Sequence, residues 1–212
     1  MAGIQEVYEL VAKGKAKKVA AAVEAALAEG CEPAAILNEG MIAAMDEVGA
    51  KFKTGEIFVP EMLVAAKAMK NGVEVLKPHL ASGDAGAAGK VIIGTVAGDL
   101  HDIGKNLVAM MLESSGFEVI DLGVDVAKEK FVEAFEANAD ARIICCSALL
   151  TTTMPALRDT VALLNSLPNR GNIKVMVGGA PISAEFAKEI GADAYTEDAA
   201  SCAQKAKELT AA

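Results

Sequence analysis

The sequence predicts an α/β protein in which a small bundle of helices precedes a five-stranded, doubly wound parallel sheet. Over the first 82 residues, apolar side chains recur at steps of three and four, which is the helical period. Beyond residue 90, short apolar runs alternate with further helical stretches, and this alternation is typical of a parallel sheet covered on both faces. We therefore expect a helical-bundle domain over residues 1–82, a linker over 83–90 and an α/β domain over 91–212.

The helical domain is expected to contain four or five short helices. Gly30 and Pro33 separate the first helices, and Pro60 suits the first turn of a later one. Brief connections of this kind favour an antiparallel bundle. The segment ASGDAGAAGK that follows has small residues and no periodicity, as is typical of a linker.

The α/β domain is expected to contain five strands, each followed by a helix. The strand-like runs are VIIGTV, FEVIDLG, ARIICCSAL, IKVMVGG and ADAYTE, and the helical stretches start near Lys105, Ala127, Met154, Ser183 and Ala199. Ligands of such sheets bind at the carboxyl ends of the strands, where the strand order reverses. With the order 2-1-3-4-5, the loops GDLHDIG and SALLTTT would flank that crevice.

Composition and charge exclude several classes of protein. A net charge of -9 and a pI near 4.8 argue against a nucleic-acid partner, which requires a basic face. The N-terminus has neither the pattern of a signal peptide nor that of a membrane span, so we expect a cytoplasmic protein. The four cysteines lack metal-site spacing and are expected to be buried thiols. Cys145 and Cys146 would point to opposite faces of one strand, which disfavours a shared metal or a disulfide.

The loop GDLHDIG is open to several interpretations. It lacks the glycine pattern of a phosphate-binding loop and has a carboxylate where phosphate would be repelled. A receiver-type signalling domain would need a phosphoacceptor aspartate after the third strand, where this chain has Ser147 and Leu149. In a metal site, the carboxylate of Asp99 would orient His101 so that one ring nitrogen faces the metal. One histidine cannot enclose a bare ion, but it can supply an axial ligand to a metal that already carries a macrocycle.

Three motifs in order along the chain carry a resemblance to a known family. They are Asp99-x-His101-x-x-Gly104, Ser147-x-Leu149 with Thr151, and the pair Gly178-Gly179. With these motifs and its helical half, the chain resembles the cobalamin-binding corrinoid proteins of methylamine, methanol and betaine methyltransferase systems. It is similar also to the cobalamin module of methionine synthase.

The resemblance implies a cobalamin or related corrinoid cofactor and a role for each matching residue. His101 would replace the cofactor's own base as lower axial ligand of cobalt, Asp99 would lie behind it, and the displaced nucleotide tail would enter a channel beside the sheet. Phe52 and Val59, from the helical half, would cap the reactive face of the corrin. The full set of cofactor-binding residues implied is Gly98, Asp99, His101, Asp102, Gly104, Ser147, Leu149, Thr151, Gly178, Gly179, Tyr195, Ala199, Phe52 and Val59.

The function implied is that of a methyl carrier that is not an enzyme on its own. Its partners would be a substrate:corrinoid methyltransferase, a second methyltransferase with tetrahydrofolate or coenzyme M as acceptor, and a reductive activase, with no nucleic acid or membrane. A cobalamin storage protein or the small subunit of a mutase remains an alternative. A cobalamin-responsive regulator would need a DNA-binding element for which this acidic chain has no room. The sequence leaves the methyl donor open among methanol, methylamines, betaines and methoxyaromatics.

Overall fold

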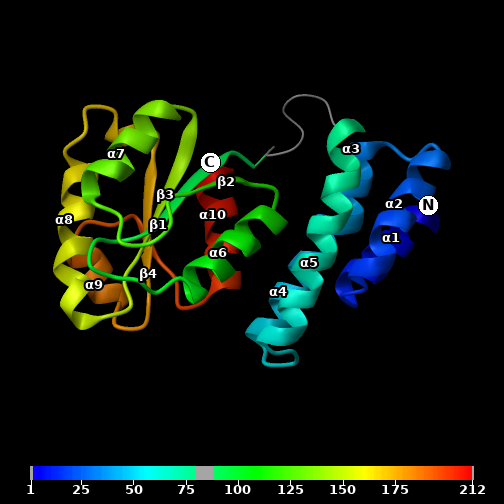
Figure 1. The fold of residues 1–212 in the computed structure, drawn as a ribbon, viewed down its shortest axis with the longest axis horizontal. Helices are drawn as coiled ribbons and strands as arrows, with labels where there is room; N and C mark the ends of the chain where they lie inside the picture. The colour runs from blue at the N-terminus through cyan, green and yellow to red at the C-terminus, as the bar shows by residue number, and fades with distance from the viewer. Residues whose placement is uncertain (1, 80–87, 212) are drawn as a thin grey trace. The chain divides into compact units, whose positions relative to one another are not determined.

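A computed structural model of the chain describes residues 2–79 and 88–211. The chain forms two compact units, one built from the N-terminal helices and the other containing the sheet (Figure 1). Of the expected linker over 83–90, residues 83–87 lie outside the described part of the chain.

The first unit consists of helices, as the period of its apolar residues predicts. Its elements are α1 (Ala2–Ala12), α2 (Ala16–Ala28), α3 (Pro33–Ala35), the π-helical turn η1 (Ile36–Ile42), α4 (Ala43–Lys53), α5 (Val59–Leu76) and the 3-10 turn η2 (Lys77–His79). The elements from α3 to α4 follow one another without a break, so the π segment lies inside one longer helix. Valine and methionine fill the core, since aromatic residues are few. The fully buried members include Val7, Val11, Val19, Val23, Met41 and Met62.

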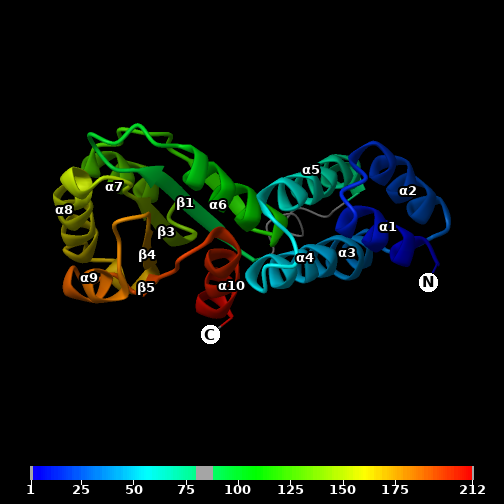
Figure 2. The ribbon, with the colours of Figure 1, turned by 90° about the horizontal axis from the view of Figure 1, so that it is seen from below.

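The second unit is a five-stranded parallel sheet with the order β2-β1-β3-β4-β5, which confirms the predicted fold class. The strands are β1 (Lys90–Thr95), β2 (Glu118–Asp121), β3 (Ala141–Ser147), β4 (Lys174–Gly178) and β5 (Ala194–Tyr195). The main helices are α6 (Ile103–Ser114), α7 (Lys128–Ala137), α8 (Met154–Asn165), α9 (Ala184–Glu189) and α10 (Ala199–Thr210). Helices α7, α8 and α9 cover one face of the sheet, and α6 and α10 cover the other (Figures 1 and 2).

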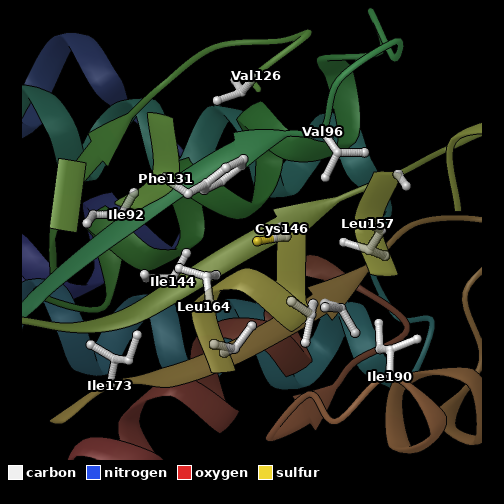
Figure 3. Close-up of a cluster of buried hydrophobic side chains, with 14 of the residues drawn as sticks. Ile92, Val96, Val126, Phe131, Ile144, Cys146, Leu157, Leu164, Ile173 and Ile190 are labelled. Carbon is white, nitrogen blue, oxygen red and sulfur yellow. The ribbon is translucent and has the colours of Figure 1, made fainter. Parts of the chain in front are cut away.

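Alternation along the strands divides the buried side chains between the two faces. Ile92, Ile144 and Cys146 belong to the apolar cluster on the side of α7 and α8, together with Phe131 and Leu157 (Figure 3). The neighbouring residues Thr95, Cys145 and Ser147 belong to the opposite series of positions. The strand order reverses between β1 and β3, so their carboxyl ends define the expected binding crevice.

The described residues confirm one smaller expectation, that of buried cysteine thiols. All four cysteines are free and buried. His79 is exposed at the end of the helical unit. Among the helices of residues 2–79 and 88–211, we find none with the length and apolar character that crossing a membrane requires.

Candidate functional site

The loop between β1 and α6 holds an aspartate and histidine in direct contact. Asp99 Oδ1 lies 2.7 Å from His101 Nδ1 and also accepts the main-chain N–H of His101 at 3.1 Å. The Thr95 hydroxyl, at the end of β1, donates to the His101 carbonyl at 2.9 Å. The backbone and one ring nitrogen of His101 are therefore fixed by residues of its own loop and strand.

Asp99 is the buried centre of this arrangement. Its side chain is 0% exposed, whereas that of His101 is 49% exposed. The second carboxylate oxygen accepts the N–H of Leu149 at 2.7 Å and the hydroxyl of Thr153 at 2.8 Å. Burial alone would raise the pKa of Asp99, but the hydrogen bonds from Leu149, Thr153 and His101 outweigh it and hold the pKa well below its ordinary value. The carboxylate is therefore charged at neutral pH.

A charged Asp99 determines which nitrogen of His101 is free. A carboxylate only accepts hydrogen bonds, so Nδ1 must carry the proton and donate. In the neutral ring, Nε2 then has a free lone pair, and the ring is half exposed. This is the arrangement by which a hydrogen-bonded histidine becomes a metal ligand.

The loop after β3 supplies one residue that the sequence interpretation missed. Thr151, which was expected among the cofactor-binding residues, is exposed at the start of the 3-10 turn η3 (Thr151–Thr153). Thr153 is the threonine that is buried and bonded to Asp99. A signal was present in the sequence, because Thr153 continues the buried face of α8 at Leu157 and Thr160 with helical spacing. Ser147 ends β3 and is half buried.

The expected glycines take different parts in the site. A Cβ at Gly179 would lie 1.9 Å from the Ala148 carbonyl oxygen, and φ there is +128°, so this position requires glycine for the packing of the β3 and β4 loops. The Ala148 N–H donates to the Gly178 carbonyl in the same region. A Cβ at Gly104, in contrast, would meet no described protein atom within 4 Å. The space beside the first turn of α6 is therefore open.

The other expected residues of this unit lie in the loop after β1, in β5 and at the start of α10. Asp102 is exposed and accepts from the amide of Asn106 in the first turn of α6. Tyr195 belongs to β5, and Ala199 is buried at the start of α10. Among the described residues, we identify no hydrogen bond that joins any of these three to Asp99 or His101.

Lys105 is a second residue that the sequence interpretation left without a role. Its ammonium group is almost fully buried and donates to both carboxylate oxygens of Asp121, at 2.7 and 2.6 Å. Asp121 ends β2, so this ion pair joins the first turn of α6 to the neighbouring strand. The ion pair is one of the contacts that fix the helix directly after His101.

Large apolar side chains of the loops after β1 and β3 are left uncovered by the described protein. Leu100 is 73% and Ile103 86% exposed, and Leu149 and Leu150 of the facing loop are more than a third exposed. An exposed apolar patch of this kind marks a ligand or partner surface. Four large apolar side chains around one imidazole fit a broad, apolar ligand better than a small polar one.

Phe52 and Val59 lie on the two sides of the connection between α4 and α5. Phe52 is half buried near the end of α4, whereas Val59 begins α5 and is 41% exposed. Phe58, which the sequence interpretation did not include, is 67% exposed in the same connection. This end of the helical unit therefore presents an apolar surface of its own.

The donor set suits a metal that brings most of its own ligands. In residues 2–79 and 88–211, we find no group of three histidine, cysteine or carboxylate side chains that could enclose an ion. A single oriented imidazole within an apolar surface instead fits the fifth or sixth ligand of a macrocyclic metal complex. The residues present therefore fit a corrinoid.

Comparison with known proteins supports the same cofactor. A family model described as B12 binding domain matches residues 89–203, and a second model with the same description matches residues 4–77. Dimethylamine corrinoid protein 1 of Methanosarcina acetivorans is 48% identical over 98% of this chain and 97% of its own. Trimethylamine corrinoid protein 1 of Methanosarcina mazei is 42% identical over 94% of this chain and 96% of its own length.

Solved structures give the same result. A cobalamin-binding protein from Desulfitobacterium hafniense matches with a TM-score of 0.80 and 29% identity, covering 97% of this chain and 98% of its own. The methanol:cobalamin methyltransferase complex MtaBC of Methanosarcina barkeri contains a chain that matches with a TM-score of 0.84 and 28% identity, with 99% of this chain and 80% of that one covered.

Proposed function

Because this chain belongs to the family of B12-binding corrinoid proteins, we propose that it is the methyl-carrying subunit of a multi-component methyltransferase system, with His101 as lower axial ligand of its corrinoid. The observation that carries the proposal is the pairing of His101 Nδ1 with the buried, charged carboxylate of Asp99 at 2.7 Å. That pairing leaves Nε2 free in a half-exposed ring. The corrinoid would be bound base-off, with its own lower base displaced by the histidine.

The corrinoid supplies a cobalt centre that accepts and releases a methyl group, and the protein binds and orients it. Asp99 keeps the proton on Nδ1 of His101, and the Leu149 N–H and Thr153 hydroxyl hold Asp99 in place. The exposed leucines and Ile103 provide apolar contacts for the lower face of the ring. Ser147, Thr151 and the open space beside Gly104 would receive the nucleotide tail, and Phe52 and Val59 would shield the upper face.

We propose a methylated amine as the methyl donor, because the relatives at 42% to 48% identity carry dimethylamine and trimethylamine in their names. A substrate:corrinoid methyltransferase would bind that donor. A second methyltransferase would pass the methyl group to tetrahydrofolate or coenzyme M, and a reductive activase would restore the reduced cofactor.

The test of the ligand is the absorption spectrum of the purified protein loaded with methylcobalamin. His101→Ala should change the spectrum to that of a methylcorrinoid without a lower nitrogen ligand, for which methylcobinamide is the reference. His79→Ala is the matched control, because His79 is the other histidine of the chain and is exposed in the helical unit. A spectrum that is the same for wild type and His101→Ala contradicts the ligand assignment.

The test of the carrier role is transfer of the methyl group. Wild-type protein carrying a labelled methyl group should release label to tetrahydrofolate or coenzyme M when the matching methyltransferase is added. Loading from labelled dimethylamine, compared with labelled methanol, tests the donor. Stable binding without transfer to either acceptor would favour a storage protein.

A further inference from the structure

The loop that follows β2 contains none of the residues expected in the site. It is nevertheless hydrogen-bonded at several points to the end of β1 and to the loop between β1 and α6, residues 96–102, which we call the ligand loop. The Thr95 N–H donates to the Gly123 carbonyl at 3.0 Å, and the Val126 N–H donates to the Thr95 carbonyl at 2.9 Å. Val96 and Val126 form an isolated parallel bridge beyond the ends of their strands. The pairing of β1 with its neighbour therefore continues along the start of the ligand loop.

Asp125 lies at the centre of this pairing and holds two successive residues of the ligand loop. Its Oδ1 accepts the Gly98 N–H at 2.7 Å, and its own N–H donates to the Asp99 carbonyl at 2.9 Å. Asp125 thus bonds to the main chain on both sides of the peptide link between Gly98 and Asp99. This peptide link leads directly into the residue that orients His101.

The backbone of Asp125 indicates that this geometry is imposed. Its φ is +52°, and among the described residues we find no other residue except glycines with a positive φ. The left-handed region is unfavourable for most side chains and persists where the surroundings require it, often at functional sites. Asp125 is exposed, so burial of its side chain does not account for the conformation. The hydrogen bonds that Asp125 makes with Gly98 and Asp99 account for the conformation.

Gly98 shows the complementary constraint. Its φ is +80°, and the Asp99 N–H donates to the Val96 carbonyl at 3.2 Å, which closes a tight turn around Gly98. Within this turn the Gly98 N–H points outward and finds its acceptor in Asp125. Without that acceptor, the turn would keep its own closing bond but lose its attachment to the β2 loop.

We propose that Asp125 is a positioning residue for His101, acting through Gly98 and Asp99. By fixing the turn before Asp99, it sets the direction of the carboxylate and hence that of the imidazole, so that Nε2 is oriented before the corrinoid binds. The proposal rests on the proposed function, in which His101 is the ligand. The alternative is that Asp125 only closes the connection between β2 and α7.

Three substitutions separate these two roles. Asp125→Gly keeps the positive φ but removes the acceptor, and Asp125→Asn keeps both, because asparagine tolerates this region and has a carbonyl oxygen at the same place. Ser183→Gly is the matched control. It removes a side-chain acceptor from the Phe186 N–H at the start of α9, in the same unit but in another loop.

In the protein without corrinoid, Asp125→Gly should accelerate hydrogen exchange at the Gly98 amide by about tenfold or more, the factor for one lost charge-assisted bond. The 15N signals of the His101 ring should move, because Nδ1 is no longer held firmly against Asp99. After loading, the dissociation constant for methylcobalamin should rise about five- to tenfold. Asp125→Asn, which keeps a neutral acceptor, should lie between wild type and Asp125→Gly in each measurement, and Ser183→Gly should remain within about twofold of wild type.

The proposal is overturned if Asp125→Gly leaves the Gly98 exchange and His101 signals unchanged, or if Asp125→Asn is as disruptive as Asp125→Gly. A rise in the dissociation constant without any change in the unloaded protein also overturns it, because the orientation would then not precede binding. Failure of the proposed function has a different result. In that case His101→Ala leaves the methylcobalamin spectrum unchanged, while Asp125→Gly still alters Gly98 and His101 in the unloaded protein.

Discussion

The hydroxyl of Thr153 gives the sharpest test of how His101, the proposed ligand, is supported. Thr153→Val preserves the shape of this buried side chain but removes the donor that lies 2.8 Å from Asp99 Oδ2. A hydrogen bond to a charged group contributes about 1.5 to 3 kcal/mol, and Asp99 is fully buried, so water cannot replace the donor. We therefore expect the free energy of unfolding of the α/β unit to fall by about 1.5 to 3 kcal/mol.

Thr153→Ser is the matched control, because it keeps the hydroxyl and removes the methyl group. Loss of one buried methyl group costs about 1 kcal/mol. If the hydroxyl matters through Asp99, valine is the more damaging substitution. If Thr153 matters through packing alone, serine is the more damaging substitution. That order would refute a role of the hydroxyl through Asp99.

Native-state hydrogen exchange at central amides of the sheet, such as those of Ile144 and Val177, measures this free energy for the α/β unit separately from the helical one. A difference of 1 kcal/mol changes the exchange rate about fivefold. The assay thus resolves the expected order of the two variants.

The effect of Thr153→Val should depend on pH in one direction. The pKa of Asp99 is lowered in the folded protein. The carboxylate therefore stabilises the fold at pH values above its ordinary pKa, which is about 4. This contribution declines as the pH falls from there toward the pKa of the folded state. Removing the Thr153 donor weakens the charged form. The gap between wild type and Thr153→Val should therefore be largest above about pH 5 and shrink below about pH 4. A gap that does not change with pH would show that the hydroxyl does not act through a charged Asp99.

Four further substitutions test the surroundings of the site. Lys105→Met removes the cation that pairs with Asp121 and should reduce stability by about 2 kcal/mol, which is below the roughly 3 to 5 kcal/mol of fully buried pairs because Asp121 is 39% exposed. Adding Asp121→Asn should recover part of the loss, and no recovery in hydrogen exchange would argue against the ion pair. The Cβ added by Gly104→Ala would meet no described atom within 4 Å, so this variant should leave the unloaded fold intact. The Cβ added by Gly179→Ala would lie 1.9 Å from the Ala148 carbonyl oxygen, so this variant should not fold. A methylcobalamin affinity unchanged in Gly104→Ala would contradict passage of the cofactor tail beside α6.

The sequence was sufficient for a five-stranded parallel sheet because each strand is a distinct apolar run followed by a helix. The order 2-1-3-4-5 was an assumption about such sheets, and the structure has that order. The helices begin within two residues of the expected positions, at Ile103, Lys128, Met154, Ala184 and Ala199. The last strand is shorter than expected, with only Ala194 and Tyr195 paired. A run such as ADAYTE has the composition of a strand, but the length of pairing depends on the neighbouring edge, which one sequence does not describe.

The site was predictable where chemistry is specific and not where several equivalent groups compete. Asp99 and His101 are distinctive in type and spacing, and the structure places them in contact. Thr151 and Thr153 carry the same hydroxyl, so only the helical phase that continues into α8 distinguishes the buried one. Asp125 lies in a loop without periodicity, and its contacts depend on the pairing of β1 and β2.

The support of His101 depends on bonds between loops that are far apart in the sequence. Asp99 accepts from Leu149 and Thr153 of the β3 loop through its side chain, and its carbonyl accepts from Asp125 of the β2 loop. The first strand lies between the second and third, so its loop can be held by a neighbouring loop on each side. A ligand on an edge strand would lack one of these supports. The interior position of β1 therefore allows Asp99 to be fixed from two directions, which leaves the Nε2 side of the His101 ring free for the proposed cofactor.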